Sequence, residues 1–172
     1  LLYTAGTTGN PKGVAISHGN IFANAVQFAL ATGMTTEDIH LHPGPLFHSG
    51  HLKSTAVSLV GAAHVYLPDF TADNVLGAIA RHRVTIASLV PTVIIRTLKE
   101  GDPASYDLST LRRIFHGSAP MPVEWIRRAM ETFAGVDLQQ GYGLTETSSG
   151  GTTLDPEEYR AARASGEYDR LS

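Results

Sequence analysis

The 172-residue chain contains no cysteine, which excludes disulfide scaffolds, thiolate metal sites and cysteine nucleophiles. The sequence also has no large excess of acidic or basic residues: 13 basic and 16 acidic residues leave a formal net charge of −3. Such a balance argues against a nucleic-acid coat or a polybasic membrane anchor. No apolar run approaches the roughly 18 residues of a membrane span, and no signal segment opens the sequence. These absences are compatible with a cytoplasmic protein, which we expect.

What is present is the composition of one folded core. Hydrophobic residues make up 42% of the chain, and a chain of this size can bury roughly two-thirds of its unfolded surface. No internal repeat, low-complexity segment or linker divides it. The sequence begins at Leu1 inside an apolar run and stops at Ser172 soon after a charged stretch. We therefore expect it to be part of a longer protein.

Short β-branched segments alternate with segments of helical spacing. The predicted strands cover residues 1–4, 13–16, 40–42, 64–67, 84–90, 113–116 and 136–140. The predicted helices follow the caps Ser17 and Thr71, begin at Pro91, cover 122–133, and lie between Asp155 and Gly166. Ser and Thr are good helix caps, and Pro suits a first helical turn. This alternation predicts an α/β fold, a largely parallel layered sheet with flanking helices.

The most informative segment runs from Thr4 to Gly13. Its three glycines let backbone N–H groups approach an anion, three threonines add hydroxyl donors, and Lys12 adds a positive charge. The segment suits a polyphosphate. A Walker A loop is excluded because Lys12 is followed by glycine, and a Rossmann fingerprint because the segment joins two predicted strands. A plain surface hairpin is the structural alternative.

The stretch Tyr3–Val14 resembles the phosphate-loop signature of the adenylate-forming superfamily, which includes acyl-CoA synthetases, luciferases and peptide-synthetase adenylation domains. Ala5 stands where serine, threonine or glycine is commoner in that family. The resemblance implies that the loop from Thr4 to Lys12 holds the β- and γ-phosphates of ATP. The loop residues concerned are Thr4, Gly6, Thr7, Thr8, Gly9 and Lys12.

A second glycine-containing segment, Gln140–Thr147, follows a predicted strand. Its structural alternative is a turn in which Tyr142 packs and Glu146 is solvated. The segment resembles the second core motif of the same family. That resemblance implies that Tyr142 lies against adenine, Thr145 contacts the α-phosphate and Glu146 binds Mg²⁺, together with the hydroxyl of Thr4. The other implied nucleotide contacts are Gln140, Gly141 and Gly143 here, and Gly117, Ser118 and Ala119 in the turn 116–120.

Eight histidines are many for this length, and four of them fall within residues 40–51. On a strand, His40 and His42 would place both rings on one face, a spacing found in metal sites. A zinc hydrolase is therefore an alternative, although no His-Glu-x-x-His motif occurs and we expect most of the rings to be surface or packing residues. The segment Pro45–Gly50 resembles the acyl-pocket motif of the family, which implies that His48, Ser49 and Gly50 contact the carboxylic acid substrate.

The combined resemblance implies an ATP-dependent acid–thiol ligase. A carboxylate, from a fatty or aryl acid, attacks the α-phosphorus of ATP to give an acyl-adenylate and pyrophosphate, and coenzyme A then displaces AMP. Positioning and charge neutralisation around phosphorus dominate such chemistry, and the groups for it are Lys12, Thr145 and Glu146. An adenylation domain that loads a carrier protein is the alternative within the superfamily. A non-catalytic nucleotide-binding module is another.

Some family elements do not occur in the sequence. A Thr-Gly-Asp segment, whose aspartate binds the ribose in the family, is absent, as are the hinge and the small C-terminal domain with its adenylation lysine. We therefore expect residues 1–172 to be the central part of the AMP-binding N-terminal domain. By itself this part is expected to bind nucleotide weakly and not to turn over.

Overall fold

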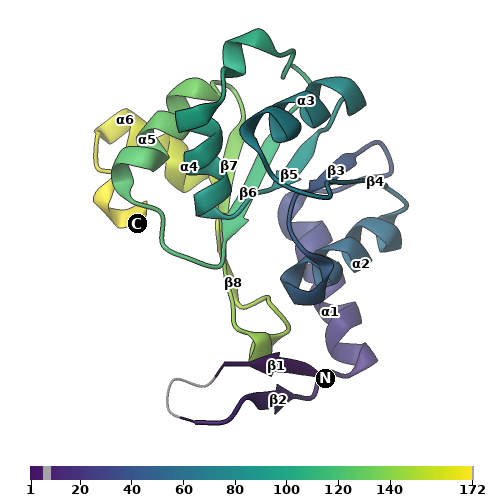
Figure 1. Cartoon of the computed structure of the whole chain (residues 1–172). Helices are drawn as coiled ribbons and strands as arrows, with labels where there is room; N and C mark the ends of the chain where they lie inside the picture. Colours follow the sequence, from purple (N-terminus) through teal and green to yellow (C-terminus); the bar gives the residue numbers. More distant parts are fainter. Residues whose placement is uncertain (6–8, 172) are drawn as a thin grey trace.

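The computed structural model describes residues 1–5 and 9–171, and the side chains of residues 48, 49 and 51 also lie outside that description. Within the described part, one main sheet has six strands. They are β3 (Ile39–His42), β4 (Ala63–Tyr66), β5 (Ile86–Ser88), β6 (Arg113–Gly117), β7 (Asp137–Tyr142) and β8 (Thr152–Leu154). Their order across the sheet is β4-β3-β5-β6-β7-β8 (Figure 1). All neighbours are parallel except β7 and β8, so the prediction of a largely parallel sheet is confirmed.

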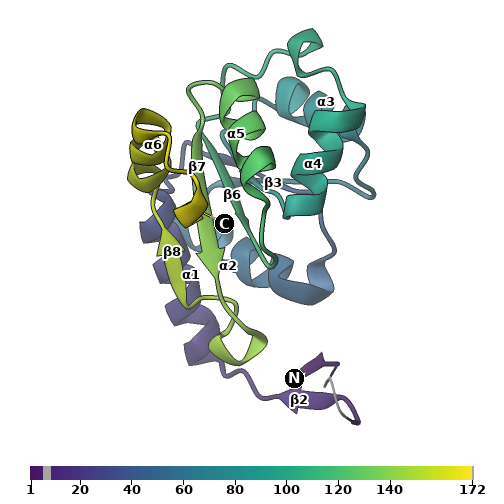
Figure 2. The same ribbon diagram turned by 90° about the vertical axis from the view of Figure 1, so that its left-hand side faces the viewer.

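Helices cover both faces of this sheet. They are α1 (His18–Thr32), α2 (His51–Val60), α3 (Ala72–His82), α4 (Pro91–Glu100), α5 (Val123–Thr132) and α6 (Pro156–Ser165). Figure 2 shows α3, α4 and α5 side by side along one side of the sheet, with α1 on the other. Short 3-10 or π turns lie at Leu46–Gly50, Pro103–Ser105, Thr145–Thr147 and Asp169–Leu171. Among the described residues, no helix has the length and apolar character needed to cross a membrane.

Alternation along the strands divides the core in two. Leu41, Ala87 and Ile114 pack with α3, α4 and α5 in the larger cluster. Ile86 and Phe115, each one residue away from these, pack instead with α1 and α2. Successive strand side chains point to opposite faces, so each buried strand supplies both clusters. The sheet face toward α1 and α2 also carries the polar side chains of His40, His42 and Ser88.

Local signals in the sequence set most helix ends. Ser17 accepts a hydrogen bond from the backbone N–H of Asn20, and Thr71 accepts one from Asn74. Pro91 and Pro156 open α4 and α6, and Gly166 ends α6 with a φ of 79°. These helix boundaries agree with the predictions, because capping depends on residues within one turn of the chain.

Three elements differ from the predictions. The strand expected over 84–90 is β5, which covers only Ile86–Ser88, and α2 and β8 were not predicted. The sequence of α2 has glycine at both ends and no side-chain cap. The strand β8 exists because Thr152–Leu154 pairs with Gln140–Tyr142, a contact that local sequence does not indicate.

The first two strands form a separate hairpin. Strand β1 (Leu2–Thr4) pairs antiparallel with β2 (Lys12–Val14), which confirms that the glycine- and threonine-rich segment joins two strands; the second strand lies one or two residues earlier than predicted. Figure 1 shows the hairpin beyond the end of the sheet, near the turn that joins β7 to β8. The tip of the hairpin, residues 6–8, lies outside the described residues.

Candidate active site

A cavity of about 520 Å³ opens at the carboxyl ends of the parallel strands. Its lining includes the last residues of several strands, His42 of β3, Ser88 of β5 and Gly117 of β6. The sheet order reverses between β3 and β5, because β4 lies on one side and β5 to β7 on the other. Ligands of open α/β sheets bind at such a reversal, outside the carboxyl ends of the strands. The position alone therefore makes this cavity the candidate site.

The strand register brings polar side chains to the inner end of the cavity. Ser88 and Phe115 are paired across β5 and β6, and both line the cavity. His42 lies two residues beyond His40, which pairs with Ile86 two residues before Ser88. The period of two keeps His42, Ser88 and Phe115 on the face toward α1 and α2.

Close backbone approaches form the floor of the cavity. A Cβ on Gly117 would lie 2.2 Å from the carbonyl oxygen of Gly141, its partner on β7. A Cβ on Gly141 would lie 2.3 Å from Cζ of Phe115. Real Cβ atoms do not approach that closely, so glycine at 117 leaves room for the backbone of β7 and glycine at 141 leaves room for the Phe115 ring.

The turn between β7 and β8 holds its shape through its own hydrogen bonds. The hydroxyl of Thr147 accepts from the backbone N–H of Leu144 at 2.9 Å, and the N–H of Ser149 donates to the Leu144 carbonyl at 2.9 Å. A Cβ on Gly143 would lie 2.2 Å from the Ser149 carbonyl oxygen. Within this turn Thr145 lines the cavity, whereas Glu146 is exposed. Glu146 makes no hydrogen bond or ion pair with the described residues.

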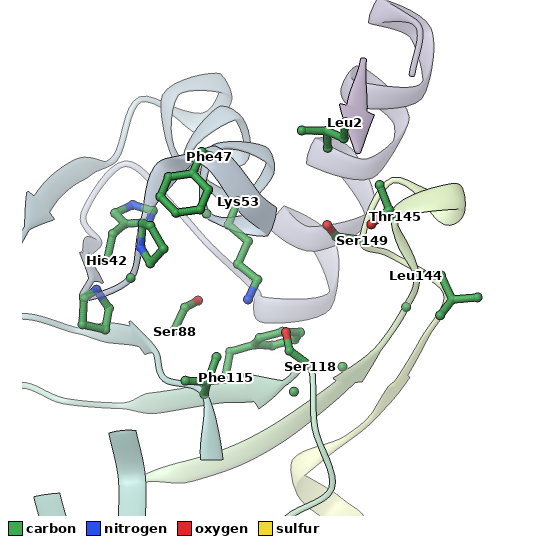
Figure 3. A pocket seen from close by; sticks show the side chains of 18 of the residues that line it. Leu2, His42, Phe47, Lys53, Ser88, Phe115, Ser118, Leu144, Thr145 and Ser149 are labelled. Carbon is green, nitrogen blue, oxygen red and sulfur yellow. The ribbon is translucent and has the colours of Figure 1, made fainter. Parts of the chain in front are cut away.

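Lys53 enters the cavity from α2 (Figure 3). It lies three and four residues before Ala56 and Val57, which are buried against Phe115 and α1, so helical spacing turns its stem to the same side. Its Nζ lies 5.0 Å from the centroid of the Phe115 ring. Burial lowers the pKa of Lys53 to about 8.

A chain of ring contacts runs outward from the cavity wall. His40 Nε2 lies 3.0 Å from Ser88 Oγ, and His40 Nδ1 lies 3.0 Å from His42 Nε2. His42 Nε2 in turn lies 3.2 Å from His64 Nδ1, which contacts the Tyr66 hydroxyl at 3.0 Å.

The buried rings in this region favour the neutral form. Burial, with His64 and Lys53 nearby, lowers the pKa of His42 to about 3. Burial and Lys53 lower the pKa of His116 to about 4, and burial also lowers the pKa of His40 well below its usual range. The rings are therefore neutral at pH 7, so Lys53 supplies the positive charge of the cavity.

The structure brings several predicted site residues into this one cavity. Its lining includes Gly50, Gly117, Ser118, Gly141, Gly143 and Thr145. Tyr142, 64% exposed, lines a smaller adjoining cavity of about 200 Å³. Both cavities share Lys53, Phe115, Gly141 and Ser149. Segments distant in the sequence therefore meet in one cavity.

Other predicted residues lie outside the lining. Thr4, Gly9, Lys12, Ala119, Gln140 and Glu146 do not line either cavity. The side chain of Gln140 accepts a hydrogen bond from the Tyr159 hydroxyl at 3.4 Å, on the side of α6. Gly6, Thr7 and Thr8 lie outside the described residues, as do the side chains of His48 and Ser49. The roles predicted for all of these residues stay predictions.

The structure tests part of the zinc-hydrolase alternative. His40 and His42 do share one strand face, as predicted, and both are buried, as packing residues are. Across the described ranges, no group of three or more His, Cys, Asp or Glu side chains is placed to hold a metal ion. The side chains of His48 and His51 fall outside that description.

Sequence reasoning missed Lys53, Ser88 and Phe115. The only signal for Lys53 was its helical spacing from Ala56 and Val57, and that required a helix over 51–60 to be recognised. Ser88 and Phe115 have no motif of their own. They reach the cavity because β5 and β6 are neighbours in register.

Fold and cavity together define an α/β domain with a cavity at the carboxyl edge of its sheet. The profile of the AMP-binding enzyme family matches residues 1–168, so the chain belongs to that family. Among curated relatives, 2-succinylbenzoate–CoA ligase of Bacillus pumilus is 39% identical over 158 residues, 91% of this chain and 32% of that protein. Feruloyl-CoA synthase of Amycolatopsis is 34% identical over 157 residues, 90% of this chain and 32% of the relative.

Solved structures agree with the fold. The inhibitor-bound N-terminal domain of FACL13 from Mycobacterium tuberculosis has a TM-score of 0.85 at 31% identity, over 93% of this chain and 40% of that one. O-succinylbenzoate coenzyme A synthetase (MenE) of Bacillus subtilis, in complex with ATP and magnesium ion, has a TM-score of 0.80 at 37% identity, over 91% and 32%. The chain thus spans about a third of the length of the curated relatives it matches.

Proposed function

We propose that this chain supplies the nucleotide- and acid-binding centre of an ATP-dependent acid–CoA ligase. The observation that carries the proposal is the meeting of three motif segments in one cavity: Gly50, Gly117–Ser118 and Gly141–Thr145. The names of its relatives support a CoA ligase. We further propose that the chain is the central part of the N-terminal domain of such an enzyme, since it covers 40% of the FACL13 N-terminal domain.

The residues present fit ATP and Mg²⁺. The close-packed glycines of β6 and β7 expose backbone beside the cavity, which suits the close approach of a flat base and a phosphate. Glu146 offers an exposed carboxylate without a partner among the described residues, and Thr4 offers a hydroxyl. Oxygen ligands of this kind suit Mg²⁺, which keeps waters and substrate phosphates in its shell. When bound, Mg²⁺ would neutralise charge on the phosphates.

Positioning is the main task of the chain's own residues in the proposed adenylation. Tyr142 and the Gly117–Ala119 turn hold adenine, and Thr145 donates a hydrogen bond to the α-phosphate. Lys12, exposed on β2, approaches the outer phosphates with the hairpin. The acid carboxylate, held beside His48, Ser49 and Gly50, attacks the α-phosphorus in line, and pyrophosphate leaves. Orientation and fixed dipoles supply the rate in such a site.

The test is acid-dependent exchange of pyrophosphate into ATP, measured with the full protein that carries this chain. We expect Glu146→Gln and Lys12→Ala to lower the exchange rate at least about a hundredfold, because removing one preorganised electrostatic group costs that much. The matched control is Glu131→Gln, an exposed carboxylate on α5, which should leave exchange unchanged. Unchanged exchange in both site variants would refute their roles.

The acceptor and the acid need separate measurements. Release of AMP on adding coenzyme A is expected. If AMP is released only with a carrier protein, the carrier-loading alternative is correct. A panel of fatty and aryl acids scored by pyrophosphate exchange identifies the acid. If no acid supports exchange, the alternative of a non-catalytic nucleotide-binding module is favoured.

A further inference from the structure

The cavity contains a cation that has no anionic partner among the residues that the structure describes. Lys53 lines both the larger and the smaller cavity. Among the described residues its ammonium has one partner, the face of the Phe115 ring. Lys53 is half-buried in the wall of the cavity, and a lysine withdrawn from bulk water is usually paired. An unpaired ammonium inside a binding cavity therefore suggests that a ligand supplies the missing negative charge.

The surroundings of Lys53 do not offset its charge. His40, His42 and His116 each have a pKa lowered in part by Lys53, so their neutral rings lie within its field. Neither cavity has an aspartate or glutamate among its described lining residues. The cavity is thus electropositive at its inner end, with hydroxyls of Ser88 and Ser118 beside it (Figure 3).

The position of Lys53 favours the acid over the triphosphate. In Figure 3, Thr145 and Ser149 lie on one side of the cavity, His42 and Phe47 on the other, and the Lys53 amine points down between them toward Ser88 and Phe115. Phe115 packs edge-on against Phe28, with ring centroids 4.9 Å apart. Apolar walls of this kind suit the hydrocarbon body of an acid, whereas a triphosphate requires water and Mg²⁺.

Resting on the proposed function, we propose that Lys53 binds a second carboxylate of the acid substrate, so that the enzyme prefers dicarboxylic acids to matched monocarboxylic acids. The carboxylate that does not react accepts a charge-assisted hydrogen bond from the Lys53 ammonium. Such bonds are about twice as strong as neutral ones. An acid that ends in a methyl group leaves the ammonium buried and unpaired, which weakens its binding.

The test uses pairs of acids that differ only at the far end: hexanoate and adipate, octanoate and suberate, 4-methylbenzoate and terephthalate. Pyrophosphate exchange with the full protein should show at least a tenfold higher kcat/KM for the diacid in at least one pair. Lys53→Met should lower that kcat/KM tenfold or more and should not lower the kcat/KM of the monoacid. Lys53→Arg should keep the preference for the diacid, and Lys53→Gln serves if the Met variant does not fold.

Three results would overturn the inference. If exchange in the wild type occurs only with monoacids, or equally with both members of every pair, the proposed ligase function holds. The inference that Lys53 binds a second carboxylate is then wrong. If Lys53→Met lowers both members equally, Lys53 holds the reacting carboxylate or a phosphate instead. Exchange with no acid at all removes the proposed function and this inference with it. Calorimetric titration with suberate and octanoate gives a readout without chemistry: suberate alone should lose affinity in Lys53→Met.

Discussion

Lys53 combines a binding role with a cost to the fold. Burial lowers its pKa to about 8 from 10.5, so the native state holds the ammonium less readily than the unfolded chain does. The cost is present in full below pH 8, shrinks as pH rises toward 10.5, and is gone above it, where both states are neutral. Sites built for ligands commonly carry such costs.

We therefore predict that Lys53→Met stabilises the protein at pH 7. Methionine fills a similar volume without a charge, and the gain should be about 1–3 kcal/mol in the free energy of unfolding, since one pKa unit corresponds to about 1.4 kcal/mol. Urea unfolding at pH 7 and pH 10.5 measures it. The gain should shrink at the higher pH, and a destabilised variant at pH 7 would contradict the prediction.

Gly117 provides a second residue-scale prediction. Gly117→Ala would place a methyl group 2.2 Å from the backbone of Gly141, and backbone cannot rotate away as a side chain can. We expect a loss of about 1–3 kcal/mol in the free energy of unfolding, typical of overpacking. The matched control is Gly44→Ala, where no atom lies within 4 Å of the new Cβ. Equal stability of the two variants would show that β6 and β7 separate easily.

At the scale of elements, one ion pair connects three segments. The carboxylate of Asp38, just before β3, accepts hydrogen bonds from Arg112 Nε at 2.9 Å and Nη2 at 2.8 Å, and from the Thr85 hydroxyl at 2.7 Å. Arg112 Nη2 also donates to the carbonyl of Gly33 at the end of α1. The pair therefore joins α1 and β3 to the beginning of β6.

We predict that Asp38→Asn lowers the free energy of unfolding by about 3 kcal/mol at pH 7, because it leaves Arg112 without its counter-charge. Burial by itself would raise the pKa of Asp38, but hydrogen bonds from Arg112, Thr85 and Thr35 outweigh it and lower the pKa to about 2. The ionised Asp38 carboxylate therefore contributes to the free energy of unfolding in full above pH 3.8, and this contribution is lost as pH falls through 2.

Urea unfolding at pH 7 and pH 2.5 tests this, and the difference between wild type and Asp38→Asn should narrow at the lower pH. Glu100→Gln is the control, because the Arg96–Glu100 pair is exposed and such pairs contribute little. A pH-independent difference would mean that Asp38 acts through packing rather than charge.

At the scale of the whole molecule, buried neutral histidines make stability depend on pH. His40, His42 and His116 are at most 3% exposed, and the pKa values of His42 and His116 are lowered to about 3 and about 4. Below pH 6.5 the unfolded chain binds protons at these rings and the native state does not. The free energy of unfolding therefore falls as pH falls.

We predict that the free energy of unfolding falls by about 1.4 kcal/mol per pH unit for each buried histidine as pH falls from 6 to 4.5. Unfolding in urea across that range measures the slope. His116→Gln should reduce the slope by about one proton, whatever its effect on stability at pH 7, while His82→Gln, at an exposed position of α3, should leave it unchanged. An unchanged slope in His116→Gln would show that His116 titrates normally.

Much of the fold could be predicted from local sequence, because its causes are local. Ser17, Thr71, Pro91 and Gly166 set helix ends within one turn of chain, and the β-branched runs gave the parallel strands. Helix α2 and strand β8 could not be predicted, since α2 has no side-chain cap and β8 depends on a partner strand ten to fourteen residues earlier in the chain.

The family and its motif segments could be recognised from the sequence, because the spacing of glycine, threonine and lysine around Thr4–Gly13 and Gln140–Thr147 is a local property. Which residues share the cavity depends on the fold. The register of β5 with β6 brought Ser88 beside Phe115, and the packing of α2 on α1 turned Lys53 over that ring. Contacts between distant segments depend on strand order and packing, which no single segment of sequence encodes.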